Sequence, residues 1–472
     1  MSTSSMALRH LAADAPGLVE RNGDAEITGL AHDSRDVNAG DLFFCVPGAN
    51  HDGHDFASDA VDQGAVGLVV ERPLNVACPQ VQTDSVRRAM GPMSSTFYGH
   101  PSQSMAVIGV TGTNGKTTVC TLMGSVLTAA GLHTEVLGTL TGTRTTPESL
   151  HLQHQLACWR SAGVEAVAME VSSHALHQHR VDGIRYDAAV FTNLTIDHLD
   201  YHGTAEEYFT AKARLFTPEL ADRAVVNRGD EHGLRLAAEP RIPTVGYDPE
   251  SLPVRVGPQG TALRWRGQDV RLPLVGRFNA ANALAAAETA LLLGASVPEI
   301  VTGLESAAPV PGRFEAIESE HPFTVIVDYA HTPDGLAQVL AAARELVADA
   351  GRLRVVFGCG GDRDAGKRPM MGQVAAEVAD QVIVTSDNPR SEDPDAIIAE
   401  ILAGVPHHSR DVMILADRRA AIARSLAEAE DGDVVVVAGK GHETTQTVGD
   451  QVIPFDDRVV ARELLAAMET AR

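Results

Sequence analysis

The chain has 472 residues, which is too long for one ordinary domain and predicts two to four. Its formal net charge is −24, so it lacks the basic footprint that general nucleic-acid binding requires. Hydrophobic residues make up 44% of the chain but aromatic residues only 4%, so we expect cores built mainly from Ala, Val, Leu and Ile.

The cysteines indicate a reducing compartment. There are five, scattered along the chain and without a C-x-x-C pair: Cys45, Cys78, Cys120, Cys158 and Cys359. This pattern argues against a disulfide framework and against a zinc site. The sequence shows no apolar run of membrane-spanning length and no apolar core of a signal peptide near its start. We therefore expect a cytoplasmic protein that is not inserted into a membrane. We also expect a monomer.

In chain order, a first domain is predicted over residues 1–102, with short strands at DLFFCVPG and GAVGLVVE and a linker at YGHPSQ. A second domain, residues 103–312, begins with the apolar run MAVIGV, a glycine-rich loop and the helical pattern KTTVCTLMGSVLTAAG. Further buried-strand patterns follow at EAVAME, AAVFTN and RAVVN, with helical stretches between them. We predict a parallel sheet covered on both faces. The stretch 250–275 gives no clear pattern.

A third domain is predicted over residues 313–472. It contains four apolar runs, FTVIVDYA, RLRVVFG, QVIVTSD and DVVVVAG, each followed by a polar cluster: HTPD, CGGDRD, NPRSED and KGHE. Ligands of open α/β sheets bind beyond the carboxyl ends of the strands, so four clusters in such positions predict a binding site. Ordinary polar turns would explain one or two of them, but four less well.

The loop GVTGTNGKTT, Gly109 to Thr118, resembles a phosphate-binding loop with altered spacing. The usual G-x-x-x-x-G-K-[ST] pattern would need a glycine at Val110, and Gly109 comes one residue too early. The strand before the loop and the helix after it nevertheless favour nucleotide binding over an ordinary turn. In that context Lys116 would neutralise the β- and γ-phosphates, and the Thr117 hydroxyl would reach Mg²⁺.

Two further segments, MEVSSHALHQHR and FTNLTIDHLDYHG, follow predicted strands of the same sheet. Glu170 is a carboxylate suited to Mg²⁺. The second segment carries a dense set of possible ligands and bases: Asn193, Asp197, His198, Asp200 and His202. The competing interpretation is a zinc site at His174, His177 and His179, but their spacing fits no common zinc pattern.

Lysine is scarce. Of the 38 lysines and arginines only four are lysine: Lys116, Lys212, Lys367 and Lys440. An amine is a compact charge and can act as a nucleophile, whereas a guanidinium cannot readily lose a proton. Compositional bias alone would leave lysines at random positions, but all four lie in motif-like segments. We expect each to be retained for a chemical reason, which argues against a merely solvated helical lysine at Lys212.

These segments together resemble the Mur ligases, the amide-forming enzymes of peptidoglycan synthesis. The resemblance runs in order through GVTGTNGKTT, EVSSHAL, TNLTIDHLDYHG, YFTAKARLF, GRFNAANALAA, VPGRFE, DYAHTPDGL, GGDRDAGKRPMMG, DNPR and GKGHE. The family's loop has the same displaced glycine. The resemblance implies an α/β chain of three domains, with a central P-loop parallel-sheet ATPase domain between a UDP-muramoyl-peptide domain and a Rossmann-like C-terminal domain for the amino acid.

The resemblance implies that ATP phosphorylates a peptide carboxylate and that an amine then attacks the acyl phosphate. Lys116, Glu170, His198 and Lys212 are the implied catalytic residues. Thr117, Glu170, His198 and Lys212, the last as a CO2-derived carbamate, would serve two Mg²⁺ ions. The implied ATP-binding residues are Gly112, Thr113, Asn114, Gly115, Lys116, Thr117, Thr118, Asn279, Arg313 and Asp328.

The implied partner in the first two domains is UDP-N-acetylmuramoyl-L-alanyl-D-glutamate. Its contacts would come from Ser34, Asn50, His51, Thr145, Thr146, Ser172, Gln178 and Arg180. Arg180 would anchor a peptide carboxylate. Arg144 stands where asparagine is common in the family, and the stretch between Thr118 and Thr145 is shorter than usual.

The implied amine is meso-2,6-diaminopimelate, bound by Arg363, Asp387, Asn388, Pro389, Arg390, Gly439 and Glu443. Arg390 of DNPR would clamp the distal carboxylate, which L-lysine lacks. Alternatives are the same ligase with L-lysine or another amine, a relative acting on folate or cyanophycin, a plain P-loop kinase, and a nucleotide-binding module without catalysis. Because ATP and amine sites fall on different domains, we also expect domain closure.

Overall fold

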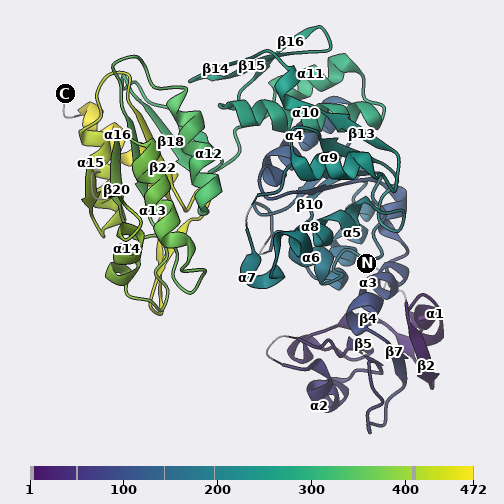
Figure 1. Cartoon of the computed structure of the whole chain (residues 1–472). Helices are drawn as coiled ribbons and strands as arrows, with labels where there is room; N and C mark the ends of the chain where they lie inside the picture. Colours follow the sequence, from purple (N-terminus) through teal and green to yellow (C-terminus); the bar gives the residue numbers. More distant parts are fainter. Residues whose placement is uncertain (1–4, 49–50, 143, 196, 407–410, 471–472) are drawn as a thin grey trace.

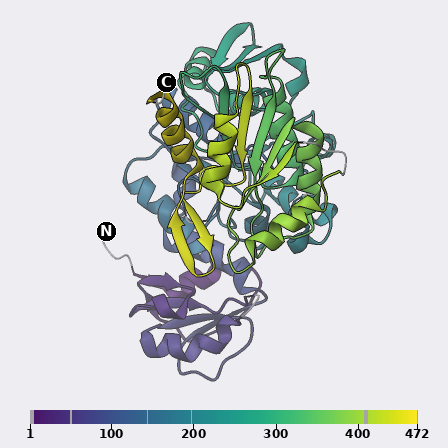
Figure 2. The same ribbon diagram turned by 90° about the vertical axis from the view of Figure 1, so that its left-hand side faces the viewer.

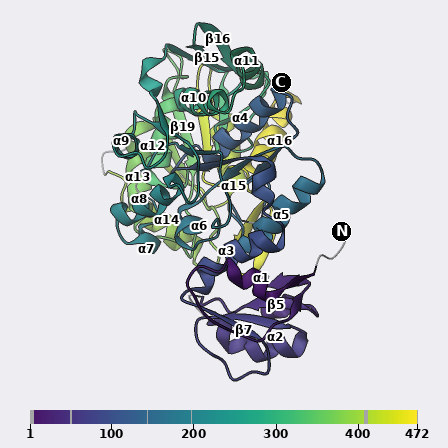
Figure 3. The same ribbon diagram turned by 90° about the vertical axis from the view of Figure 1, so that its right-hand side faces the viewer.

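The computed structural model describes residues 5–48, 51–142, 144–195, 197–406 and 411–470. The chain forms three bodies that follow one another in the sequence, coloured purple, teal and green to yellow in Figure 1. Views from two opposite sides both place the N-terminal body at one end of the molecule (Figure 2, Figure 3). Within the described residues no helix is long and apolar enough to cross a bilayer.

The N-terminal body is built on a five-stranded sheet in the order β2-β7-β6-β5-β4. Strands β4 to β7 are parallel neighbours, and β2 pairs antiparallel with β7. Both strands predicted here are confirmed as β5 and β6, and every residue of each is buried. The elements are β1 (Met6–Ala7), α1 (Leu8–Ala13), β2 (Leu18–Asn22), β3 (Glu26–Ile27), β4 (Gly29–Ala31), β5 (Asp41–Phe44), α2 (Ala57–Gln63), β6 (Gly67–Val70), β7 (Gln80–Thr83) and α3 (Val86–Phe97).

The central body contains the predicted parallel sheet, with six strands in the order β13-β12-β11-β8-β10-β9. Helices α4, α10 and α11 pack on one face, and α5, α6 and α8 lie over the other. Its strands are β8 (Ala106–Thr111), β9 (Thr134–Leu137), β10 (Ala166–Glu170), β11 (Ala188–Phe191), β12 (Ala224–Asn227) and β13 (Thr244–Tyr247). Its helices are α4 (Lys116–Ala129), α5 (Ser149–Ser161), α6 (Ser173–His177), α7 (Leu199–His202), α8 (Ala205–Ala213), α9 (Glu231–Ala238), α10 (Arg277–Leu292) and α11 (Val297–Glu305).

The stretch without a clear sequence pattern forms a three-stranded antiparallel sheet of β14 (Val254–Gly257), β15 (Gly260–Trp265) and β16 (Gln268–Leu272). In β15 the side chains of Thr261, Leu263 and Trp265 are buried and those between them are exposed. This alternation is typical of a strand with one solvent-exposed face, but it spans only six residues. Its burial against α10 and α11 depends on the tertiary fold.

The C-terminal body is a second doubly covered sheet, in the order β17-β18-β22-β19-β20-β21. Only its edge strand β17 is antiparallel. Helices α12 to α14 pack on one face, and α15 and α16 on the other. The elements are β17 (Glu315–Ile317), β18 (Thr324–Asp328), α12 (Pro333–Arg344), β19 (Leu353–Phe357), α13 (Lys367–Val378), β20 (Gln381–Val384), α14 (Pro394–Leu402), β21 (Val412–Ile414), α15 (Arg418–Ala427), β22 (Val434–Ala438), β23 (Thr445–Val448), β24 (Gln451–Pro454) and α16 (Asp457–Thr470).

The four polar clusters of the third domain follow β18, β19, β20 and β22, which are adjacent parallel strands of this sheet. Their carboxyl ends therefore lie at one edge, and the clusters gather there as the sequence predicted. The predicted α/β class, with one parallel P-loop sheet and one Rossmann-like sheet, is confirmed.

Candidate active site

The glycine loop connects β8 to α4 at the carboxyl edge of the central sheet. Strand β8 runs through Val110 and Thr111, so the turn begins only at Gly112, which accounts for the unusual spacing. Gly112 has φ +150°, and a Cβ there would lie 1.9 Å from Oγ1 of Thr192. Gly115 is left-handed, with φ +85°, directly before the first residue of α4. The loop thus turns sharply into a helix N-terminus, which is the geometry of an anion site.

Lys116 is the first residue of α4, and its side chain curls back over the loop. Its Nζ donates hydrogen bonds to the carbonyl oxygens of Gly112 at 2.8 Å and Thr113 at 2.7 Å. Burial lowers the pKa of Lys116, and the nearby carboxylate of Glu170 opposes that shift. The ammonium is therefore held at the N-terminus of α4, where a phosphate would bind.

Glu170, the last residue of β10, faces the loop from the neighbouring strand. The Thr117 hydroxyl donates to its Oε1 at 3.0 Å, and the backbone N–H of Thr139 donates to the same atom at 2.8 Å. The side chain is buried. A Cβ on Gly138 would lie 2.2 Å from that oxygen, so only glycine allows this approach. A buried carboxylate beside a hydroxyl offers the oxygen ligands that Mg²⁺ prefers.

Lys212 lies on α8, with its side chain pointing into the protein. It is only 1% exposed, which excludes a solvated helical lysine. Its Nζ donates to the carbonyl oxygen of Gly112 at 2.8 Å and lies 4.6 Å from the ring centre of Tyr208. Burial, together with the charge of Lys116, shifts the pKa of Lys212 well below its usual value. Both effects act in favour of the neutral amine.

His198 precedes α7 and lies in a cluster of aromatic rings. Its ring centre is 4.8 Å from that of His174, which is 4.1 Å from Tyr201 and 5.4 Å from His202. Burial lowers the pKa of His198, against the opposing effect of Asp197. Burial also lowers the pKa values of His174 and His202 to about 4. These imidazoles are neutral near pH 7. His179 pairs with Asp182, with its Nδ1 2.6 Å from Oδ2 of that residue.

The C-terminal body contributes the opposite wall. Arg313 lies 4.5 Å over the ring of Tyr329, and its Nη2 donates to Oγ1 of Thr117 at 3.4 Å. Asp328 ends β18 and accepts hydrogen bonds from the backbone N–H groups of Phe314 and Ala330, at 2.6 and 2.7 Å. Burial raises the pKa of Asp328 to about 6, although Arg313 acts in the opposite direction.

These groups enclose one cavity of about 280 Å³ between the central and C-terminal bodies. Of the residues predicted from the sequence, the cavity lining brings together Thr113, Asn114, Gly115, Lys116, Thr117, Thr118, Thr145, Glu170, Ser172, Asp197, His198, Lys212, Arg313 and Asp328. The sequence did not single out several other lining residues, among them Thr139, Tyr208, Asn282, Tyr329 and His331.

Asn282, and not the predicted Asn279, lines the cavity. Asn279 is absent from the cavity lining among the described residues and lies behind it. Its side-chain nitrogen donates to Val275 at 2.8 Å, and its oxygen accepts from Asn282 at 3.0 Å. Asn282 lines the cavity instead. It follows Asn279 by three residues, so the two side chains lie on the same face of the helix. This spacing is the sequence signal by which Asn282 could have been found.

The segment around Thr145 and Thr146 carries an arginine cluster. Thr146 is buried and donates to the carbonyl of Glu170 at 2.9 Å. Arg180 donates to Gln178 at 2.6 Å and pairs with Glu148 at 3.1 Å. Three guanidinium groups surround that one buried carboxylate: Arg87 at 2.8 Å, Arg144 at 3.0 Å and Arg180. The cluster is therefore positive overall, in a chain that is strongly acidic.

The predicted uridine-binding residues lie in the N-terminal body. Ser34 begins a short 3-10 turn behind Asp33, and His51 is exposed and 6.2 Å from the ring of Phe56. Asn50 falls outside the described residues. None of these described residues lines the cavity.

The predicted amine-binding residues form a second site in the C-terminal body. Asp387, Asn388 and Pro389 are buried beyond β20, whereas Arg363 is exposed. Gly439 has φ +114°, and a Cβ there would lie 2.4 Å from Oδ2 of Asp387. The guanidinium of Arg390 donates to the carbonyl of Gly361 at 2.5 Å.

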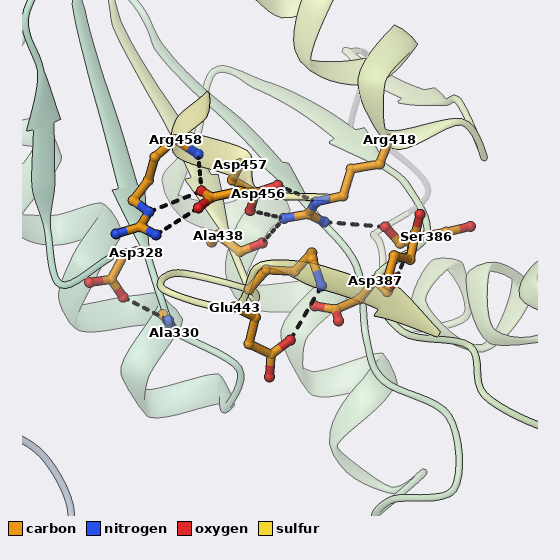
Figure 4. Close-up of polar contacts among 12 residues, drawn as sticks. Asp328, Ala330, Ser386, Asp387, Arg418, Ala438, Glu443, Asp456, Asp457 and Arg458 are labelled. Atoms are coloured by element: carbon orange, nitrogen blue, oxygen red, sulfur yellow. Dashed lines mark hydrogen bonds and ion pairs between the residues drawn. The ribbon is translucent and has the colours of Figure 1, made fainter. Parts of the chain in front are cut away.

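Figure 4 shows Glu443 and Asp387 drawn below the buried pair Arg418–Asp457. None of the described members of this amine set lines the cavity, so the two sites are distinct.

Three family models cover most of the chain. They are described as "Mur ligase family, catalytic domain", "Mur ligase middle domain" and "Mur ligase, glutamate ligase domain", and they match residues 26–96, 110–290 and 312–441.

Similar proteins include two UDP-N-acetylmuramoyl-L-alanyl-D-glutamate–2,6-diaminopimelate ligases. The one from Geobacillus kaustophilus is 46% identical over 97% of this chain and 99% of its own. The one from Streptomyces coelicolor is 44% identical over 96% and 95%.

A solved structure of a ligase of the same name superposes with a TM-score of 0.71 and 33% identity, covering 99% of this chain and 100% of that one. A MurF ligase from Thermotoga maritima, solved with ADP, shares the fold with a TM-score of 0.65 and 20% identity, over 94% and 98% of the two chains.

Proposed function

The chain belongs to the Mur ligase family, and we propose that it is an ATP-dependent ligase that joins meso-2,6-diaminopimelate to UDP-N-acetylmuramoyl-L-alanyl-D-glutamate in peptidoglycan synthesis. The observation that carries the proposal is the cavity in which Lys116, Glu170 and Lys212 face Arg313 and Asp328. The names of relatives that match nearly the whole chain support the choice of substrates. We assign residues 1–102, 103–312 and 313–472 to the muramoyl-peptide, ATP and amino-acid domains.

Two steps are expected. A carboxylate oxygen of the peptide attacks the γ-phosphorus of ATP, the bond to the bridging oxygen breaks, and ADP leaves. The amine then attacks the acyl carbon, loses a proton and expels phosphate. The protein contributes position and charge. The helix N-terminus of α4 and Lys116 hold the phosphates, Arg313 approaches from the other wall, and Asp328 holds the ribose.

The oxygen donors in the cavity fit magnesium. Thr117 and Glu170 would hold one ion, and His198 with modified Lys212 would hold a second. Bound there, Mg²⁺ would offset the negative charge of the phosphates. The direct hydrogen bond from Thr117 to Glu170, at 3.0 Å, keeps the two ligands together within a buried wall.

We propose that Lys212 carries a carbamate, formed when its neutral amine attacks CO2 and releases one proton. The low pKa of Lys212 supports this, because only the neutral amine is nucleophilic. The product keeps one N–H, so the hydrogen bond to Gly112 can persist. The neighbouring Lys116 would stabilise the new negative charge.

The dipeptide substrate would lie between the arginine cluster and the cavity. Thr145 and Ser172 line the cavity, and Arg180 lies beside Thr146 and Gln178, with its Nη1 3.2 Å from the carbonyl oxygen of Thr146. In the N-terminal domain Ser34, Asn50 and His51 would bind uridine. A cytoplasmic location and a monomeric state remain predictions from the sequence.

The test is ATP-dependent phosphate release with the UDP-muramoyl dipeptide, comparing meso-diaminopimelate with L-lysine. We expect release with diaminopimelate and little with lysine. Release with L-lysine alone would agree with a ligase but overturn the assignment of meso-diaminopimelate as the amine. No release with either amine would overturn the proposed function.

A further inference from the structure

Lys440 is a buried cation for which the proposed reaction has no use. It follows β22 by two residues, and its side chain is fully buried. Lys116 and Lys212, the other two lysines with buried amines, both belong to the ATP cavity. Lys440 instead lies among the residues of the amine site.

The ammonium of Lys440 has all its hydrogen bonds satisfied by the protein. Its Nζ donates to the carbonyl oxygen of Thr445 at 2.6 Å, to Oδ1 of Asn388 at 3.3 Å and to Oε2 of Glu443 at 3.3 Å. An ammonium has three N–H donors, so none is left for a substrate. Lys440 therefore acts on a ligand only through Asn388 and Glu443.

The same contacts fix the two side chains that would meet the ligand. The Asn388 oxygen also accepts from the backbone N–H of Thr447 at 3.0 Å, and its nitrogen donates to Oε2 of Glu443 at 2.7 Å. The amide therefore has one orientation. Both bonds to Glu443 end on Oε2, and within the described residues Oε1 accepts none. Since this side chain is 32% exposed, Oε1 is available to an ammonium from outside.

We propose that Lys440 is a positioning residue for amino-acid selection. It holds Asn388 and Glu443 so that the free oxygen of Glu443 accepts the ammonium at the distal end of a diamino acid. The inference rests on the proposed function and adds to it a residue that would not touch the substrate. A lysine suits this place because three acceptors converge on one buried point, which a planar guanidinium fork does not match.

The experiment compares wild type with Lys440→Met, Lys440→Arg and a control, Arg419→Met. Arg419 lies in the same domain, and its pair with Glu463 is about half exposed, at 50% and 52%. Phosphate release gives KM for diaminopimelate, ATP and the muramoyl dipeptide separately. We expect both Lys440 variants to raise KM for diaminopimelate by about tenfold or more, with the other two KM values within about twofold. The control should change none of them.

Loss of a buried lysine can unfold a domain. A double-mutant cycle that combines Lys440→Met with Glu443→Gln therefore gives a second measurement. If Lys440 acts in part through Glu443, the double variant Lys440→Met/Glu443→Gln should raise KM for diaminopimelate by less than the product of the two single effects. Additive losses would overturn the inference, as would an unchanged KM for diaminopimelate in Lys440→Met or equal rises in all three KM values. Failure of wild type itself to turn over diaminopimelate would instead refute the proposed function.

Discussion

The ion pair between Arg418 and Asp457 provides a sharp test of what holds the C-terminal body together. The guanidinium donates to both carboxylate oxygens, at 2.8 and 2.7 Å, and neither side chain is exposed. It also donates to the carbonyl oxygens of Ala438 at 2.9 Å and Ser386 at 3.2 Å. Arg418 thus joins the start of α16 to the carboxyl ends of β22 and β20, next to the amine site (Figure 4).

Replacing Arg418 with methionine removes the charge but keeps most of the apolar volume. Asp457 is left buried without a cation, and two backbone carbonyls lose a donor. Breaking one partner of a buried pair costs about 3–5 kcal/mol. The adjacent Arg419 is the control, because its pair with Glu463 is about half exposed and contributes about 0–1 kcal/mol.

Hydrogen exchange of the amides of β22, in the full-length protein, is the suitable assay. Both tryptophans, Trp159 and Trp265, belong to the central body, so intrinsic fluorescence does not report on this domain. A loss of about 3–5 kcal/mol speeds the exchange of amides that open with the whole domain by roughly two to three and a half orders of magnitude. Arg419→Met should speed it by less than about tenfold.

Equal exchange rates in Arg418→Met and Arg419→Met would refute the reasoning that a buried ion pair stabilises the domain more than an exposed one. A further variant separates lost attraction from a stranded charge. Arg418→Met/Asp457→Leu leaves no buried charge and should recover most of the loss, because apolar replacement of a whole buried pair is often neutral. If the double variant is as unstable as Arg418→Met, the unpaired carboxylate is not the cause.

Three other predictions concern the ATP cavity. Lys212→Ala should lower the rate of phosphate release at least about 100-fold, and formate or acetate should restore part of it; full activity without them would exclude a carbamate. Burial lowers the pKa of His331 from 6.5 to about 4. Between pH 6.5 and about pH 4 the unfolded chain therefore binds more protons than the folded chain. Calorimetry should therefore show stability that is constant above pH 6.5 and lost as pH falls toward 4, with a weaker dependence in His331→Gln; an unchanged pH profile in the variant would contradict this. Gly138→Ala should push Glu170 aside and lower kcat/KM at least about tenfold, whereas Gly257→Ala, where the nearest atom is 3.9 Å from the added Cβ, should have no effect on catalysis.

Much of the fold was predictable because it depends on local patterns. The apolar runs of the two large sheets are buried on both faces, so they stand out in the sequence without any knowledge of their partners. The strand β8, the glycine loop and α4 follow from one continuous segment. The stretch 250–275 was not predictable in the same way, since its strands are short and at most one face of each is buried.

Of the residues predicted for the site, those at strand ends line the cavity, whereas the one predicted on helix α10 does not. Glu170 and Asp328 end their strands and line the cavity as the order of elements implies. On α10 the sequence analysis predicted Asn279 alone, and only the packing of that helix decides that Asn282, three residues later, reaches the cavity.

The sequence by itself determined the types of the elements, their order and the scarcity of lysine, because these are properties of neighbouring residues. The tertiary structure alone decided what the lysines contact. None of the four is exposed; the amine of Lys212 donates to the carbonyl oxygen of Gly112, and that of Lys440 to the side-chain oxygen of Asn388. Their chemistry depends on burial and on partners that are up to 100 residues away along the chain. A pattern of local neighbours carries no information about such distant contacts.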